Sequence, residues 1–385
     1  MYDVIIIGAG PAGLMAAINL KNKKILLIEK NETIGKKLLI TGGSRCNITN
    51  LKNTDEFLKN LNNEFLKCSL NSFGPKQIFK FFEKRNLKLK IEEDDKVFPF
   101  SNKSNDILDI LKKEIKDKVE LNLNENVIDI DFKTKEVITN KDKYKSKNII
   151  IATGGLSYPN TGSTGDGYKF AKKNNQKTTS LYPSQTYLTT KESYDLSGIT
   201  IDKVIIKYEN HISNGSMLFT HKGISGPSVF KISEHVYKNL KNNSKIIVDF
   251  INYNEEELIN KILKYDKNKE IKSFFREFLP RRLVDKVINT NKKIKFINIK
   301  EIKELINKFK NFEIEIKSTG TISQSFVTGG GIDLNYINEK TMESKIYKNV
   351  YFIGEVLDIH GNTGGYNITI AMSSGYSAAT DINKR

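Results

Sequence analysis

The stretch YDVIIIGAGPAGLMAAINLKNKKILLIEK, residues 2–30, decides the fold. Residues 4–7 form a short β-branched apolar run, which is typical of a buried parallel strand. Residues 14–20 favour a helix, and residues 25–28 form a second apolar run that ends at Glu29. The stretch therefore predicts a strand–helix–strand unit with a G-x-G-x-x-G turn between its first two elements.

Each glycine of this turn has a physical role. Gly8 permits the tight turn, Gly10 lets the backbone approach a pyrophosphate, and Gly13 lets helix and strand pack closely. The N-terminus of the helix faces the phosphates. Glu29, about 20 residues downstream, can accept hydrogen bonds from an adenosine ribose that carries no phosphate. We therefore expect dinucleotide binding; the alternative is a glycine-rich turn without a ligand.

Charge is the main compositional feature of the chain. Its 385 residues leave room for two or three domains and include 62 basic and 45 acidic residues, a net charge of +17. Lysine, asparagine and isoleucine are used heavily, which is typical of an AT-rich genome and accounts for part of the charge. A field this positive favours polyanions such as nucleic acid.

Several classes of protein are excluded by the remaining composition. No apolar run reaches the 18 or so residues of a membrane span, and the N-terminal stretch lacks the basic start of a signal peptide. Cys46 and Cys68 fit a reducing compartment, so we expect a cytoplasmic protein without a membrane partner. The four histidines show no metal-ligand spacing, so we expect no metal.

Only one complete fingerprint exists, which indicates a single tightly held dinucleotide. Three later segments indicate that this dinucleotide is FAD. NIIIATGG, residues 148–155, is an apolar strand that ends in glycines, and NVYFIGEVLD, residues 349–358, is another that ends in Gly354 and Glu355. GNTGGYNITIA, residues 361–371, opens the last helix, whose positive N-terminus can stabilise charge on a flavin. Each segment alone could be an ordinary glycine turn.

The segment TGGSRCN, residues 41–47, follows the ribose-binding acid and is expected to run along the cofactor toward the flavin ring. Gly42 allows close approach, and Arg45 and Asn47 can hydrogen-bond the cofactor. Cys46 is a candidate catalytic residue that could reach the ring or the substrate. The alternative for Cys46 is a small residue packed beside the cofactor.

Together these motifs resemble the BaiN/RdsA family of bacterial FAD-dependent oxidoreductases, also known as aminoacetone-oxidase-type flavoproteins. The matching stretches include GKKLLITGGSRCNITN, ATGGLSYPNTGSTGDGY and FTHKGISGP, and they span almost the whole chain. The resemblance implies an α/β fold, with a Rossmann-like FAD-binding domain of the two-dinucleotide-domain type and inserted β-barrel and helical subdomains. His221, in the last of these stretches, is a second candidate catalytic residue; the alternative is a histidine that stabilises a turn.

The expected layout and contacts can be stated by residue. The FAD domain comprises residues 1–190 and 316–385, the barrel residues 191–252 and the helical subdomain residues 253–315. The expected cofactor contacts are Gly8, Gly10, Pro11, Ala12, Gly13, Glu29, Lys30, Lys37, Gly42, Arg45, Asn47, Val127, Thr153, Gly154, Gly155, Gly354, Glu355, Asp358, Gly364, Gly365, Tyr366 and Asn367.

An arginine–phenylalanine cluster suggests a nucleic-acid contact. SFFREFLPRRLVDK, residues 273–286, holds Arg276, Arg281 and Arg282, three of the six arginines in a chain that prefers lysine. One interpretation is an RNA-binding patch. The other is an amphipathic helix with a phenylalanine core.

Family activities include enone reduction in steroid metabolism, amine oxidation and uridine reduction in large-subunit ribosomal RNA. We expect reduction of a conjugated C=C bond, with uridine in 23S ribosomal RNA as substrate. The alternative is a small-molecule enone reductase or an amine oxidase. Because no second fingerprint exists, NADPH or NADH is expected to bind transiently as electron donor.

Overall fold

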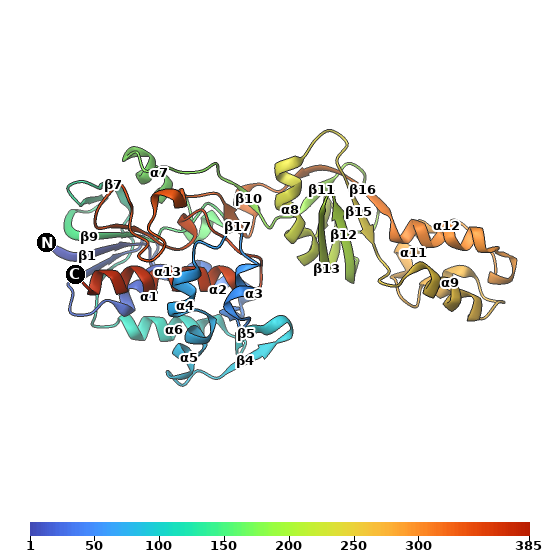
Figure 1. Ribbon diagram of the computed structural model, residues 1–385, viewed down its shortest axis with the longest axis horizontal. Coiled ribbons are helices and arrows are strands. Elements are labelled where there is room, and N and C mark those ends of the chain that lie inside the picture. Colours follow the sequence, from blue (N-terminus) through green and yellow to red (C-terminus); the bar gives the residue numbers. More distant parts are fainter. The chain divides into compact units, whose positions relative to one another are not determined.

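The computed structural model describes all residues from 1 to 385 and divides them into two compact units. Residues 1–182 and 326–385 form the first, here called the nucleotide unit, and residues 183–325 form the second, here called the inserted unit. The chain thus leaves the first unit once and returns to it (Figure 1).

A seven-stranded sheet forms the centre of the nucleotide unit. The strands β6, β2, β1 and β9 pair in parallel in that order, and β18 also pairs in parallel with β9, while β8 and β7 continue the sheet antiparallel. Their bounds are β1 Tyr2–Ile7, β2 Ile25–Ile28, β6 Glu120–Asn122, β7 Val127–Asp131, β8 Glu136–Thr139, β9 Lys143–Ile151 and β18 Val350–Phe352. The predicted strand–helix–strand unit is present.

Helices and a small second sheet complete this unit. The helices are α1 Pro11–Asn19, α2 Lys36–Ser44, α3 Thr54–Leu58, α4 Lys67–Phe73, α5 Pro75–Glu83, α6 Ser104–Ile115, α7 Asp166–Lys173 and α13 Tyr366–Asn383. The small sheet consists of β3 Thr49–Asn50, β5 Lys96–Pro99 and β4 Leu89–Glu92. Each strand of the small sheet is only two to four residues long.

Helices from the two ends of the chain pack against each other. α1 and α13 run side by side (Figure 1), and Asn383 accepts a hydrogen bond from the backbone N–H of Lys21 at 3.0 Å. A Cβ atom on Gly375 of α13 would lie 2.4 Å from the backbone oxygen of Ala12 in α1. The absence of a side chain at Gly375 therefore permits this helix contact.

The inserted unit is a closed six-stranded barrel with helices added to it. Its strands pair in the order β11 Leu188–Thr190, β14 Gly223–Ser225, β13 His211–Thr220, β12 Thr200–Tyr208, β15 Lys245–Asp249 and β16 Phe312–Thr319. α8 (Pro227–Asn239) packs on the barrel. β10 (Tyr182–Ser184) spans the point where the chain enters this unit, and β17 (Val327–Gly329) follows its return.

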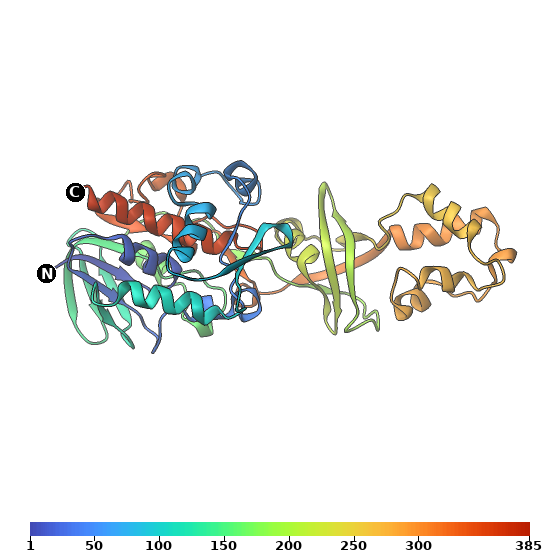
Figure 2. The same cartoon turned by 90° about the horizontal axis from the view of Figure 1, so that it is seen from below.

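The helical segment is an insertion within the barrel. The helices α9 Glu255–Lys264, α10 Ile271–Phe275, α11 Arg281–Val287 and α12 Ile299–Lys310 lie between β15 and β16 in sequence and gather at one end of the barrel (Figure 2). The barrel thus includes strands on both sides of the range 191–252. β11 precedes this range, and the alternating stretch FEIEIKST, which forms β16, follows it. None of the helices in the structure combines the length and apolar character needed to cross a membrane.

We expect the substitution Gly375→Ala to destabilise the nucleotide unit. Helix propensity alone would favour alanine by about 1 kcal/mol, but the added methyl would be forced against the backbone of α1. The expected net effect is a loss of about 1–2 kcal/mol in the free energy of unfolding, measured by urea denaturation. Thr380→Ala, at a half-buried position of the same helix, is the control and should change little. A more stable Gly375→Ala protein would contradict the tight contact.

Candidate functional site

The turn between β1 and α1 forms an open cradle at a helix N-terminus. Gly10 is the N-cap of α1, with φ −81° and ψ −179°, and no side chain caps the helix. A Cβ atom on Gly10 would meet nothing within 4 Å, whereas one on Gly13 would lie 2.0 Å from the backbone oxygen of Gly8. The helix is therefore pressed against the turn, and space remains at Gly10 for a group that accepts hydrogen bonds from N–H groups.

Glu29 is held beside this turn. Its carboxylate, at the end of β2, accepts hydrogen bonds from the backbone N–H of Ala9 at 2.9 Å and from the backbone and side chain of Asn31 at 2.9 and 2.7 Å. The side chain is buried. Three donors fix the carboxylate in one orientation, as a hydroxyl-binding acid requires.

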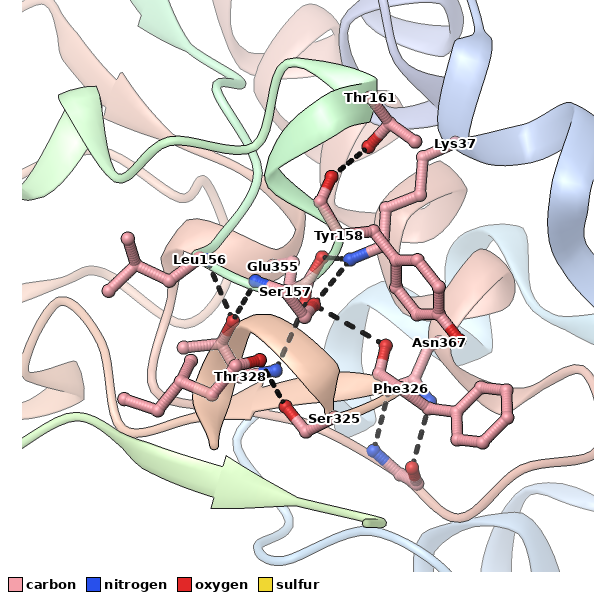
Figure 3. A network of polar contacts seen from close by, with 12 residues as sticks. Lys37, Leu156, Ser157, Tyr158, Thr161, Ser325, Phe326, Thr328, Glu355 and Asn367 are labelled. Atoms are coloured by element: carbon pink, nitrogen blue, oxygen red, sulfur yellow. Dashed lines mark hydrogen bonds and ion pairs between the residues drawn. The ribbon is translucent and has the colours of Figure 1, made fainter. Parts of the chain in front are cut away.

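A polar network joins four distant segments of the nucleotide unit (Figure 3). The Lys37 ammonium donates to Glu355 at 2.7 Å and to the Ser157 hydroxyl at 2.6 Å. Glu355 also accepts from Ser157 at 2.9 Å and from the backbone N–H of Thr328 at 3.1 Å. Burial raises the pKa of the Glu355 carboxyl, but Lys37 and these donors lower the pKa overall. The Glu355 carboxylate is therefore ionised at neutral pH.

The network is anchored to the fingerprint and to the strand that ends in glycines. A Cβ atom on Gly354 would lie 2.9 Å from the Cβ atom of Ala12, and one on Gly155 would lie 2.4 Å from the Thr328 hydroxyl. That hydroxyl accepts from the backbone N–H of Leu156 at 2.8 Å. The structure thus brings together three of the predicted segments around α1.

Two buried polar atoms in this region lack a hydrogen-bond partner. They are Asn47 Oδ1 and Thr153 Oγ1. Asn47 lies at the N-terminus of α13, since a Cβ atom on Gly365 would lie 2.9 Å from its Oδ1 atom. No side chain caps this helix. An unpaired buried acceptor costs about 1–3 kcal/mol, so the site fits a ligand that offers N–H donors to Asn47 and oxygen acceptors to the helix. A flavin ring has both.

Cys46 lies in the hydrophobic core of the nucleotide unit, and its backbone N–H donates to the Thr41 oxygen at 3.0 Å. Its side chain is fully buried, and burial raises the pKa of its thiol to about 12. A thiol that remains neutral is a poor nucleophile and a poor proton donor. The geometry favours the alternative of a small packed residue.

Arg45 is engaged by neighbours within the nucleotide unit. Its guanidinium bonds Glu92 at 2.9 Å and lies 4.0 Å from the ring centre of Phe98. Thr41, Gly42 and Gly43 interrupt α2 with non-helical backbone angles. A contact between Arg45 and the cofactor stays a prediction.

The other predicted cofactor contacts are distributed around the same unit. Lys30 bonds Asp166 at 2.6 Å and also Thr164, and Asn367 exchanges two hydrogen bonds with the backbone of Gly361. Asp358 accepts from Thr179 at 2.8 Å and lines a cavity of about 420 Å³. Gly8, Pro11 and Gly13 lie in the turn and first helix, Gly154 follows β9, Gly364 and Tyr366 flank the start of α13, and Val127 is buried at the start of β7.

The residues predicted in the inserted unit make mainly local contacts. His221 is exposed in the turn between β13 and β14. Arg276 bonds Asp285 at 2.5 Å, and Arg282 donates to the backbone oxygens of Asp195 and Ser197. Arg281 is 80% exposed.

The phenylalanines of the arginine–phenylalanine cluster belong mainly to the core. Phe274 and Phe275 are buried, and Phe278 is 37% exposed. The burial favours the interpretation of a phenylalanine core, but residues 273–286 belong to two short helices, α10 and α11, and not to one amphipathic helix. RNA binding by the three arginines stays a prediction.

Sequence reasoning missed Ser157 and Thr328 as site residues. Ser157 lies in the stretch ATGGLSYPNTGSTGDGY, which was identified for its glycines. Thr328 lies in VTGGGI, where no Rossmann pattern follows. Two glycine-rich stretches with adjacent hydroxyls were the available signal, but their pairing depends on contacts between distant segments.

Comparison with known proteins agrees with this geometry. The family model described as HI0933-like protein Rossmann domain matches residues 2–381. The ribosomal RNA dihydrouridine synthase of Haemophilus influenzae is 32% identical over 399 residues, which cover 99% of this chain and 98% of the relative. The 3-dehydro-bile acid delta(4,6)-reductase of Clostridium scindens is 28% identical over 409 residues, which cover 100% of both chains.

A solved structure shows the same fold at much lower identity. The 3-ketosteroid delta1-dehydrogenase of Sterolibacterium denitrificans, in complex with 1,4-androstadiene-3,17-dione, superposes with a TM-score of 0.53 and 12% identity. The superposition covers 100% of this chain and 99% of the dehydrogenase. The chain accordingly belongs to the HI0933-like family of FAD-dependent oxidoreductases, which corresponds to the BaiN/RdsA type.

Proposed function

We propose that the protein reduces uridine to dihydrouridine in 23S ribosomal RNA and draws its electrons from NADPH or NADH. The observation that carries this proposal is the similarity to the Haemophilus influenzae ribosomal RNA dihydrouridine synthase over 99% of the chain. The net charge of +17 supports it, because phosphate contacts contribute much of the affinity for nucleic acid. Action on ribosomal RNA also implies a cytoplasmic protein.

The contacts with FAD that belong to this proposal lie in the nucleotide unit. The open turn at Gly10 and the N-terminus of α1 would hold the pyrophosphate, and Glu29 would hold the ribose. Asn47 and the start of α13 would bind the polar edge of the flavin ring. Bound there, FAD supplies two-electron redox chemistry.

Uridine is a suitable substrate for this chemistry. Its C5=C6 bond is conjugated to the C4 carbonyl, so the base is chemically an enone. Reduction adds two electrons and two protons across that bond and leaves the glycosidic bond intact. In a stacked strand the base would have to leave its neighbours to reach a buried ring. The Lys37–Glu355 ion pair, together with the hydrogen bond from the Thr328 N–H to Glu355, joins three segments of the nucleotide unit.

A second candidate is reduction of a small-molecule enone. The Clostridium scindens relative is named as a bile acid reductase, and it is 28% identical over the whole chain. In that case the positive charge reflects genomic composition only. Oxidation of an amine is the other small-molecule alternative, and the electron donor distinguishes it from both reductases.

Deleting the gene from its host should remove dihydrouridine from 23S ribosomal RNA. Because reduction adds two hydrogens, mass spectrometry of nuclease fragments should show the loss of one uridine that is about 2 Da heavier than normal. Expression of the wild-type protein should restore the mass, and expression of the Gly10→Val variant should not. An unchanged RNA profile would exclude the RNA substrate and favour the small-molecule enone.

The substitution Gly10→Val should abolish FAD binding without unfolding the protein. The valine side chain would occupy the open space at the turn, where a Cβ atom meets no protein atom within 4 Å, and would block the pyrophosphate. The purified variant should lack the visible absorbance band of flavin. Denaturation should release flavin from the wild type but not from the variant. Its far-ultraviolet circular dichroism should match that of the wild type. A yellow variant would mean that the cofactor does not use this turn.

Either NADPH or NADH should bleach the flavin band of the wild-type protein under anaerobic conditions. The nucleotide must bind transiently, because the chain has only one complete fingerprint. Stopped-flow absorbance would compare the two donors at equal concentration. Bleaching by an amine, but by neither nicotinamide, would favour the amine oxidase.

A further inference from the structure

We propose that the helical segment of the inserted unit carries an RNA-binding surface distinct from its arginines; this inference rests on the proposed function. The surface, here called the lysine–phenylalanine surface, consists of Lys267, Lys269, Lys292, Lys293, Lys295 and Phe296. Its ligand is single-stranded or looped RNA, with phosphates on the lysines and a base on the phenylalanine ring.

Backbone hydrogen bonds hold the two stretches of this surface side by side. Ile294 N–H donates to the Lys269 oxygen at 3.0 Å, and Lys295 N–H donates to the Lys267 oxygen at 3.1 Å. Ile271 N–H donates to the Lys292 oxygen at 3.2 Å. The side chain of Ile294 is buried and anchors the turn to the core. The lysines therefore project from a fixed base, not from a loose loop.

The charge of the inserted unit is concentrated in this segment. Residues 255–310 contain 16 basic and 9 acidic residues, a net charge of +7 out of the +17 of the whole chain. Residues 291–300 contain four lysines and no acid. Lys292 pairs with Glu301 at 2.7 Å, but neither Lys267 nor Lys293 forms an ion pair. A surface with unpaired cations attracts a polyanion, because binding releases the counterions of the phosphates.

Phe296 is the exposed aromatic side chain of this surface. It is 66% exposed, and the Lys295 ammonium lies 5.2 Å from its ring centre. Phe274, Phe275 and Phe309 of the same segment are buried and Phe278 is 37% exposed, so Phe296 is the most exposed phenylalanine of the segment. An aromatic ring set among lysines is the combination with which proteins stack unpaired bases and hold their phosphates.

The surface also suits the chemistry proposed for the protein. Stacking on Phe296 requires a base that is not paired, and reduction requires a base that has left its stack. A duplex would offer phosphates but no free base face. The combination therefore favours a looped segment of RNA over a duplex and over a purely electrostatic partner.

Binding of a fluorescein-labelled, unstructured single-stranded RNA, measured by fluorescence anisotropy over a range of salt, tests this surface. The triple substitution Lys267→Gln, Lys293→Gln and Lys295→Gln should weaken binding and lower the slope of log K against log[salt] by about 2, since each single-strand phosphate contact contributes about 0.7. The substitution Phe296→Ala should weaken binding roughly tenfold and leave the slope unchanged.

Matched controls come from the nucleotide unit. The substitutions Lys112→Gln, Lys113→Gln and Lys116→Gln remove the same charge from exposed positions on and just after α6. Phe100→Ala removes a ring that is 67% exposed. Both controls should bind RNA like the wild type, and all four variants should retain the wild-type flavin absorbance and thermal midpoint.

Failure of this inference differs from failure of the proposed function. If the surface variants bind RNA as well as the controls do, the lysine–phenylalanine surface does not bind RNA and the inference is overturned. This result holds whether or not the host RNA contains dihydrouridine. If the wild type binds no RNA but binds vesicles of phosphatidylserine and phosphatidylcholine, the surface is a membrane contact and the inference is overturned. If the deletion strain retains its dihydrouridine, the proposed function fails, and the anisotropy still decides the surface.

Discussion

The contact between the first helix and the first turn is the constraint on which the rest of the nucleotide unit depends. A Cβ atom on Gly13 would lie 2.0 Å from the backbone oxygen of Gly8, so only glycine allows α1 to begin where it does. From that position α1 presents its N-terminus at an open turn, and its other face accepts α13. The end of β18 then meets α1 at Ala12, which brings Glu355 within reach of Lys37.

Sequence patterns predicted the parts of this arrangement that are local. The strand, the glycines and Glu29 are fixed by spacing within 30 residues, and the structure has them as expected. The Lys37–Glu355 pair spans 318 residues, and the hydroxyl residues Ser157 and Thr328, although they stand in glycine-rich stretches, join it only through contacts between distant segments. The burial of Cys46 likewise depends on packing that composition does not encode.

The arginine cluster illustrates a different limit of sequence reasoning. Arg281 and Asp285 are four residues apart on a helix, a spacing that predicts an ion pair, and Arg276 also bonds this acid. Because arginine is rare in the chain, the cluster suggested an RNA contact. In the structure, Arg276 and Arg282 instead join α10, α11 and a neighbouring loop. The lysines of residues 291–300 were not distinguished, because lysine is common everywhere in the sequence.

The return of the chain to the nucleotide unit has a consequence for synthesis. Residues 183–325 are complete before the ribosome makes α13, yet α13 packs against α1 from the first 20 residues. The inserted unit can therefore close its barrel while the first unit still lacks a helix that covers its core. Until residues 366–383 emerge, the apolar face of α1 lacks its partner helix, and the flavin-binding site proposed at the start of α13 is incomplete. On that proposal, acquisition of the cofactor is among the last events in the maturation of the protein.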